Sequence, residues 1–219
     1  LSNILKIQLF VSIIKGRISY LKLNTDITKI FVGNNYDFFT LYEMNMEGIQ
    51  NIVYNRIYNS TTRGAFSKDI EQSNLFVFPD NSYGTEGFNK YIDTILPKTK
   101  SRIRKTIKYR LTNLDSEMDL TNIKTLEELK QYSIKYYTAL KSIKDNPNEC
   151  HFVYSDSLKQ GGLILLTLLL EHISKSENWP RGGYTKGERE DTNNYILLSG
   201  ETSNNYRSRI IKSFNKESN

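Results

Sequence analysis

CHFVYSDSLKQGGLILLTLLLEHI, residues 150–173, is the stretch that decides the fold. The apolar run from His151 to Ser155 predicts a buried strand, and the leucine-rich run 163–173 predicts a helix. Gly161 and Gly162 mark a tight turn between them. Downstream, YILLSGETS at 195–203 predicts a second strand, and a final helix carries RSRIIKSFN at 207–215. Strand, helix, strand and helix in this order predict a parallel β-α-β-α unit, whose strand ends suit phosphate binding.

The composition of the whole chain favours a globular protein with a polyanionic partner. Its 219 residues include 38% apolar residues and carry a formal net charge of +6. This apolar content is enough for a core in one large or two small domains. The basic balance favours nucleic acid or another polyanion. One cysteine, Cys150, excludes an internal disulfide, so we expect a reducing compartment and a core thiol.

No segment of the sequence is suited to crossing a membrane. The longest apolar run, 163–170, is interrupted by Thr167 and is far shorter than the roughly 20 residues that a spanning helix needs. The first residues lack the pattern of a signal peptide. The chain begins with Leu1 rather than Met, so we expect it to be a piece of a longer protein.

Other elements follow from periodicity and from residues that start or end helices. Thr125 and Glu128 form a capping-box pattern, and behind them one helix reaches Asp145 with an apolar stripe of Leu129, Tyr132, Tyr136, Leu140 and Ile143. The segment Leu75–Pro79 is expected to lie against the body of the protein. The remaining predictions are helices at 4–23, 45–57 and 86–96 and short strands at 30–32 and 38–42.

These pieces together resemble superfamily 2 helicases and translocases of large DNA viruses. The resemblance rests on Ser133-x-Lys135, the 151–155 strand, Gly161-Gly162, the leucine-rich helix, Leu198-Ser199-Gly200-Glu201 and the Arg207 to Phe214-Asn215 helix. Poxvirus nucleoside triphosphatase I, the early transcription factor small subunit and giant-virus helicases are similar in this way. They also carry an insertion before the second strand, here 174–194.

The resemblance implies a fold and a division of the chain. Residues 1–122 would be a mixed α+β connector that follows the first RecA-like domain. Residues 123–219 would be the first half of the second RecA-like domain, an α/β parallel sheet of the P-loop NTPase type. ATP and magnesium are then expected for the full-length parent, and no cofactor is expected in this chain.

The chain departs from that family at its catalytic motifs. A P-loop needs a lysine after its second glycine, but Glu188 follows Gly187 in the nearest match, which starts at Gly182. No D-E-x-H run and no arginine-rich motif VI are present. We therefore assign no catalytic residue here, and whether the chain itself is enzymatic stays undecided.

Two groups of residues are candidates for nucleic-acid binding. Ser155, Lys159, Gly161 and Gly162 would offer a hydroxyl, a cation and backbone N–H groups to a phosphate. The alternative is that the glycines only make a turn and that Asp156 or Ser157 only caps the helix. The second group is the acid-free basic run 98–110, with Arg102, Arg104, Lys105 and Lys108. Ile103, Ile107 and Leu111 recur there at helical spacing, so the alternative is a solvated helix face.

The function implied is part of an ATP-dependent helicase or translocase, viral and related to transcription. The alternatives are a non-catalytic nucleic-acid-binding or transcription-factor module, and a remnant without activity. The expected partners are DNA or RNA, the first RecA-like domain, the remaining C-terminal sequence of the parent and the transcription machinery, without a membrane. The expected place is inside the infected cell, in the virion or a viral factory. His151 and His172 lack ligand companions, so no metal site is expected.

Overall fold

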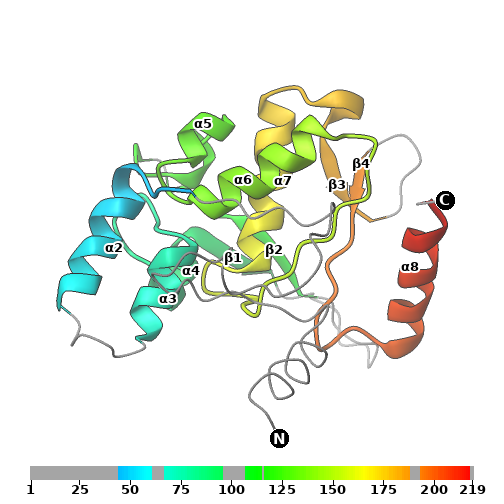
Figure 1. The fold of residues 1–219 in the computed structure, drawn as a ribbon, viewed down its shortest axis with the longest axis horizontal. Helices are drawn as coiled ribbons and strands as arrows, with labels where there is room; N and C mark the ends of the chain where they lie inside the picture. Colours follow the sequence, from blue (N-terminus) through cyan, green and yellow to red (C-terminus); the bar gives the residue numbers. More distant parts are fainter. Residues whose placement is uncertain (1–43, 61–66, 96–106, 115, 188–192, 218–219) are drawn as a thin grey trace, which may run out of the picture. The chain divides into compact units, whose positions relative to one another are not determined.

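A computed structural model describes residues 44–60, 67–95, 107–114, 116–187 and 193–217, with side chains as far as Phe214. The chain divides into two compact units, 1–43 and 44–219, and all described residues belong to the second. Figure 1 shows its elements: α2 (Gly48–Ser60), α3 (Lys68–Leu75), α4 (Gly84–Tyr91), β1 (Ile92–Ile95), β2 (Lys108–Leu111), η2 (Leu120–Asn122), α5 (Leu126–Leu129), α6 (Ile134–Asp145), α7 (Leu163–Ser176), η3 (Pro180–Gly182), β3 (Tyr184–Lys186), β4 (Asn193–Tyr195) and α8 (Asn204–Glu217).

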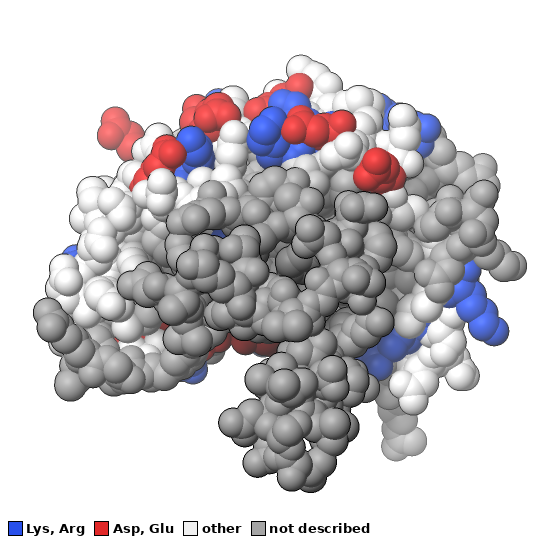
Figure 2. Space-filling model, in the orientation of Figure 1, with Lys and Arg blue, Asp and Glu red and all other residues white. Residues whose placement is uncertain are grey.

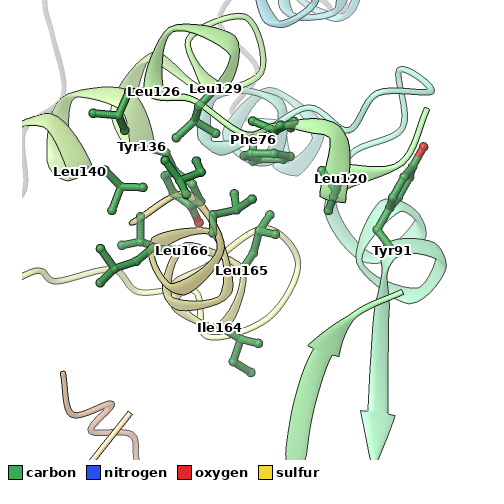
Figure 3. Close-up of a cluster of buried hydrophobic side chains, with 14 of the residues drawn as sticks. Phe76, Tyr91, Leu120, Leu126, Leu129, Tyr136, Leu140, Ile164, Leu165 and Leu166 are labelled. Carbon is green, nitrogen blue, oxygen red and sulfur yellow. The ribbon is translucent and has the colours of Figure 1, made fainter. Parts of the chain in front are cut away.

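Helix α7 lies at the centre of the main core, as its sequence predicts. Apolar residues on all sides of the helix let it be surrounded by other elements rather than lie on the surface. Its buried side chains include Leu165, Leu169 and Ile173, none of which is exposed to solvent. Figure 3 shows side chains of α5, α6 and the 76–91 region gathered around its first turns. No described helix is long and apolar enough to reach across a lipid bilayer.

The segment Leu75–Pro79 lies against the body of the protein, as predicted: Phe76 and Phe78 join the main core, and Val77 packs in a second cluster with Val53 and Ile57. Phe76, Val77 and Phe78 are completely buried. The ring centroids of Phe76 and Tyr136 are 5.5 Å apart, and those of Phe78 and Tyr91 are 5.1 Å apart. The core therefore joins residues on both sides of position 122. The functional boundary between connector and helicase domain at that position stays a prediction.

Buried Gln50 ties three helices together, which the sequence did not indicate. Its amide nitrogen donates to the carbonyls of Ser73 and Asn74 at 3.2 and 3.1 Å. Its side-chain oxygen accepts from the amide of Ile134 at 2.9 Å. Gln50 thus satisfies backbone groups at the end of α3 and the start of α6, and it fixes α2 against both.

The predicted helix from Thr125 to Asp145 is present but interrupted. The capping box of Thr125 and Glu128 is confirmed at the start of α5. The helix stops at Leu129 and resumes as α6 after Ser133. Ser133 caps α6 by accepting from the amide of Tyr136 at 3.1 Å, and its hydroxyl donates to the carbonyl of Leu75 at 2.7 Å. The break places Ser133 against the 75–79 segment. The periodicity of apolar residues does not predict this contact.

The sheets are smaller than predicted. Strands β1 and β2 pair antiparallel, with Ile92 opposite Leu111, and β3 and β4 pair in parallel, with Tyr184 opposite Asn193. The described part of the fold is therefore mixed α/β with two separate two-stranded sheets, and the RecA-like parallel sheet stays a prediction. The second predicted strand, 195–203, was wrong beyond its first residue, because β4 ends at Tyr195 and residues 196–203 form no strand.

Three further local predictions were wrong. Residues 151–155 form no strand, and Phe152 and Tyr154 are 80% and 73% exposed. Cys150 is exposed rather than a core thiol, because the strand expected to bury it is absent. Residues 108–111 of the basic run form a strand rather than a helix, since they pair with β1. The 86–96 helix is confirmed as far as Tyr91, where β1 begins. The predictions for 4–23, 30–32, 38–42 and 98–106 lie outside the described residues.

Candidate nucleic-acid interface

The loop of residues 155–162 connects residues 151–154, which form no strand, to helix α7. It carries the first group of predicted binding residues, Ser155, Lys159, Gly161 and Gly162. Gln160 and Gly161 have φ angles of 59° and 87°, so the chain turns back sharply before the helix. A Cβ on Gly162 would lie 2.0 Å from the carbonyl oxygen of Ser157. Only glycine fits this close approach of two backbone segments. The predicted tight turn is confirmed.

The backbone amides at the start of α7 are already bonded within this loop. The amides of Leu163 and Ile164 donate to the carbonyls of Ser157 and Leu158, both at 3.0 Å. The amide of Gly162 donates to the carbonyl of Lys159 at 2.8 Å. These three groups are therefore not open to a phosphate, and the helix is capped by loop carbonyls rather than by a side chain.

Two neighbouring helices hold the loop in place. The hydroxyl of Tyr136, on α6, lies against the carbonyls of Gly161 and Gly162, the second at 2.7 Å. Burial raises the pKa of this hydroxyl, so it stays protonated and donates. From α3, the side-chain amide of Gln72 donates to the side-chain oxygen of Gln160 at 3.0 Å. The loop is thus anchored at its glycine end.

Two predicted site residues of the loop, Lys159 and Ser155, keep side chains that could contact a ligand. Lys159 is exposed, and Ser155 is half-buried with its hydroxyl oxygen accepting from the amide of Ser157 at 3.2 Å. Ser157 itself donates from its hydroxyl to the carbonyl of Lys159 at 2.6 Å. Of the predicted phosphate contacts, the structure therefore leaves the cation of Lys159 and the hydroxyl of Ser155 accessible.

Lys135 is a further cation near this loop. The sequence analysis did not include it among the candidate binding residues. It lies in the first turn of α6, one residue before Tyr136. Desolvation lowers the pKa of its ammonium, whereas the charges of Asp156 and Glu71 act in the opposite direction. The Ser133-x-Lys135 motif is the sequence signal from which Lys135 could have been added to the candidates.

The second predicted group is described only in part. Arg102, Arg104 and Lys105 lie outside the described residues. Lys108 is exposed at the start of β2, where it pairs in register with Ile95. Strand β2 packs on α7. Arg110, two residues on, donates to the carboxylate of Asp93 at 2.9 Å, so its charge is neutralised across the sheet.

Helix α8 presents another basic surface, which Figure 2 shows in blue at the right of the view. Its described cations are Arg207, Arg209 and Lys212, and Ile210 of the same helix is buried. Arg207 donates to the carbonyl of Ser199 at 2.9 Å, so it fixes the turn before the helix. The guanidinium of Arg209 lies 5.1 Å from the ring centroid of Tyr206.

The two histidines have structural contacts. His172 and His151 bond through Nε2 to the carbonyls of Thr121 and Asn146 at 3.0 and 2.9 Å. Within the described ranges, no three ligand side chains gather as a metal site would require.

Comparison with known proteins relates the chain to viral helicases. It is 27% identical, over 94% of its length, to a protein of Invertebrate iridescent virus 3 named as helicase 087L. It is 26% identical, over 80% of its length, to a protein of Heliothis virescens ascovirus 3e named as an ATP-dependent RNA helicase. No protein-family model matches the chain, and no solved structure matches it.

The chain spans only 20% and 19% of the lengths of these two relatives. The similarity supports a helicase-like viral protein, because it extends over most of the chain in both comparisons.

Proposed function

We propose that this chain is part of an ATP-dependent nucleic-acid helicase or translocase, viral and related to transcription, to which it contributes grip on the nucleic-acid backbone. The observation that carries the proposal is the similarity to two viral helicases along most of the chain. The net charge of +6 supports a polyanionic partner. Because the chain spans about a fifth of these relatives, ATP and magnesium would bind residues elsewhere in the parent.

The 155–162 loop is the part of the described structure best suited to this grip. Lys159 extends from a loop that Tyr136 holds through the Gly162 carbonyl and Gln72 holds through the side chain of Gln160, so binding does not have to order the loop. The Ser155 hydroxyl can donate to a second phosphate oxygen. Side-chain contacts of this kind position a strand without reading its bases, as a translocating enzyme requires.

Lys159→Ala tests the site directly. Removing one phosphate contact should reduce the slope of log affinity against log salt by about 0.7 for single-stranded and about 0.9 for double-stranded nucleic acid. Fluorescence anisotropy with labelled single-stranded and double-stranded oligonucleotides over a range of salt concentrations measures both slopes. Lys141→Ala is the matched control, because the Lys141 ammonium is already paired with Asp145 at 2.8 Å. Equal slopes for the two variants and the unmodified chain would remove Lys159 from the interface.

The alternative is a non-catalytic nucleic-acid-binding or transcription-factor module. Nucleic-acid-stimulated ATP hydrolysis by the product of the complete reading frame separates the two functions. Salt-dependent binding without ATP hydrolysis would favour the module. A chain with neither property would be the inactive remnant.

A further inference from the structure

Asp156 is the one acidic residue in the sequence of the 155–162 loop, and it lies beside the side chains proposed to bind phosphate. It is exposed, and its carboxylate joins none of the ion pairs between described residues. It does not cap α7 either, because the first amides of that helix donate to loop carbonyls. A carboxylate repels a phosphate, so Asp156 works against binding at Ser155 and Lys159 unless another group offsets its charge.

Charged residues of α3 and α6 accompany the contacts that anchor this loop. Lys135 precedes Tyr136 and Glu71 precedes Gln72, and the hydroxyl of Tyr136 and the amide of Gln72 are the two anchors. The charges of Asp156 and Glu71 both act on the Lys135 ammonium, which the surrounding protein partly desolvates. Lys135 is therefore a cation of α6 toward which the Asp156 carboxylate is attracted.

Lys159 is a second cation that could take up the same carboxylate. It is three positions from Asp156, and the Ser157 hydroxyl donates to the Lys159 carbonyl at 2.6 Å, so the chain between them forms a turn. Within the described ranges, Lys159 forms no ion pair. An ion pair with Asp156 would neutralise the Lys159 ammonium, and the phosphate contact proposed for that ammonium would be lost.

We propose that Lys135 is a positioning residue, whose ammonium draws the Asp156 carboxylate toward α6 and so leaves the Lys159 ammonium free for a phosphate. Opposite charges attract more strongly where protein replaces water, so the partly desolvated Lys135 competes well with the exposed Lys159 for one carboxylate. The consequence for binding rests on the backbone grip proposed above, whereas the attraction itself requires no nucleic acid.

Competitive acetylation with acetic anhydride, followed by mass spectrometry, tests the positioning in the absence of nucleic acid. Lys135→Met removes the ammonium and keeps a long side chain. Asp156 should then pair with Lys159, which releases its proton less readily, so acetylation of Lys159 should slow by about threefold. Adding Asp156→Asn to Lys135→Met should restore the rate. Lys141→Met is the control and should leave the rate unchanged, because Lys141 already pairs with Asp145 at 2.8 Å.

Salt-dependent binding of labelled single-stranded oligonucleotides tests the consequence for the interface. Lys135→Met should reduce the slope of log affinity against log salt by about 0.7, as Lys159→Ala should, because both changes remove the same phosphate contact. The double variant with Asp156→Asn should recover the slope of the unmodified chain. A loss of folding caused by Lys135→Met would not be reversed by removing a neighbouring charge, so this recovery separates positioning from a structural role.

Two results overturn the proposal. One is acetylation of Lys159 at the same rate in the Lys135→Met variant and the unmodified chain. The other is a reduced salt slope that Asp156→Asn does not restore, since Lys135 would then contact the phosphate itself. If Lys159→Ala leaves the slope unchanged while acetylation responds as expected, the backbone grip at this loop is refuted and the positioning of Asp156 by Lys135 is supported.

Discussion

At Gly162, the absence of a side chain lets the 155–162 loop fold back onto the first turn of α7. The φ of this residue is −88°, an angle that any residue adopts, so the requirement for glycine is steric. The carbonyl oxygens of Ser157 and Lys159 would lie 2.0 and 2.8 Å from an added Cβ. Both belong to the backbone that supports Lys159, so the loop has no flexible group that could move aside.

Gly162→Ala should therefore destabilise the protein by about 1 to 3 kcal/mol, the usual cost of forcing extra atoms into a packed site. Urea denaturation followed by circular dichroism measures the change. Gly200→Ala is the control, because nothing lies within 4 Å of a Cβ at that exposed position. A Gly162→Ala variant as stable as the Gly200→Ala variant would contradict the steric account.

At the scale of elements, the carboxylate of Glu177 joins α5, α6 and the end of α7. It accepts from the amide of Leu126 at 2.9 Å, from the ammonium of Lys144 at 2.7 Å and from the indole of Trp179 at 2.7 Å. Desolvation raises the pKa of Glu177, but these donors outweigh it and hold the pKa below its ordinary value of 4.5. The ionised form is therefore the one that stabilises the fold.

Because the folded pKa is lowered, the stabilisation by Glu177 is present above pH 4.5 and is lost as the pH falls through the folded value. Glu177→Gln should cost about 1 to 2 kcal/mol at pH 7 and progressively less in acid. Denaturation midpoints from pH 7 to pH 3 measure this. Glu149→Gln, at an exposed residue without an ion pair among the described residues, should leave the profile unchanged. Parallel pH profiles for the Glu177→Gln variant and the unmodified chain would refute the role of the carboxylate.

At the scale of the whole described unit, the shared core couples residues before and after position 122. Phe78 stacks on Tyr91, and Phe76 packs on Tyr136, so the 75–92 region and the α5–α7 region bury one continuous cluster. Elements that share a core unfold together in one transition.

Phe78→Ala should destabilise the unit by about 3 to 5 kcal/mol, the usual cost of removing a buried aromatic ring. Trp179, the single tryptophan, lies on the far side of position 122 and is 3% exposed, so its fluorescence reports on that part. In the Phe78→Ala variant, the unfolding midpoint measured by Trp179 fluorescence should fall by as much as the midpoint measured by circular dichroism. Ile52→Ala, at a residue 67% exposed, is the control. An unmoved Trp179 transition would show that the two regions unfold independently.

The geometry of the 155–162 loop was predicted in part from the sequence, whereas its role as a binding site stays a prediction. The tight turn at Gly161 and the exposure of Lys159 follow from local chemistry and are present. Loop carbonyls accept from the amides at the start of α7, and the Tyr136 hydroxyl donates to the carbonyl of Gly162. Both contacts depend on how the loop folds back against α6. Residue spacing does not predict these contacts, so the sequence did not indicate that the amides of Gly162, Leu163 and Ile164 are already bonded within the loop.

The sequence by itself determined the features that depend on neighbouring residues. These are the buried helix α7, the Thr125 capping box, helix α8 and the burial of Phe76 to Phe78. Only the tertiary structure decided where the predicted 125–145 helix breaks, because Ser133 bonds to Leu75 far away in the chain. The 151–155 run has the residues of a strand but forms none, since a strand exists only when another segment supplies its hydrogen bonds.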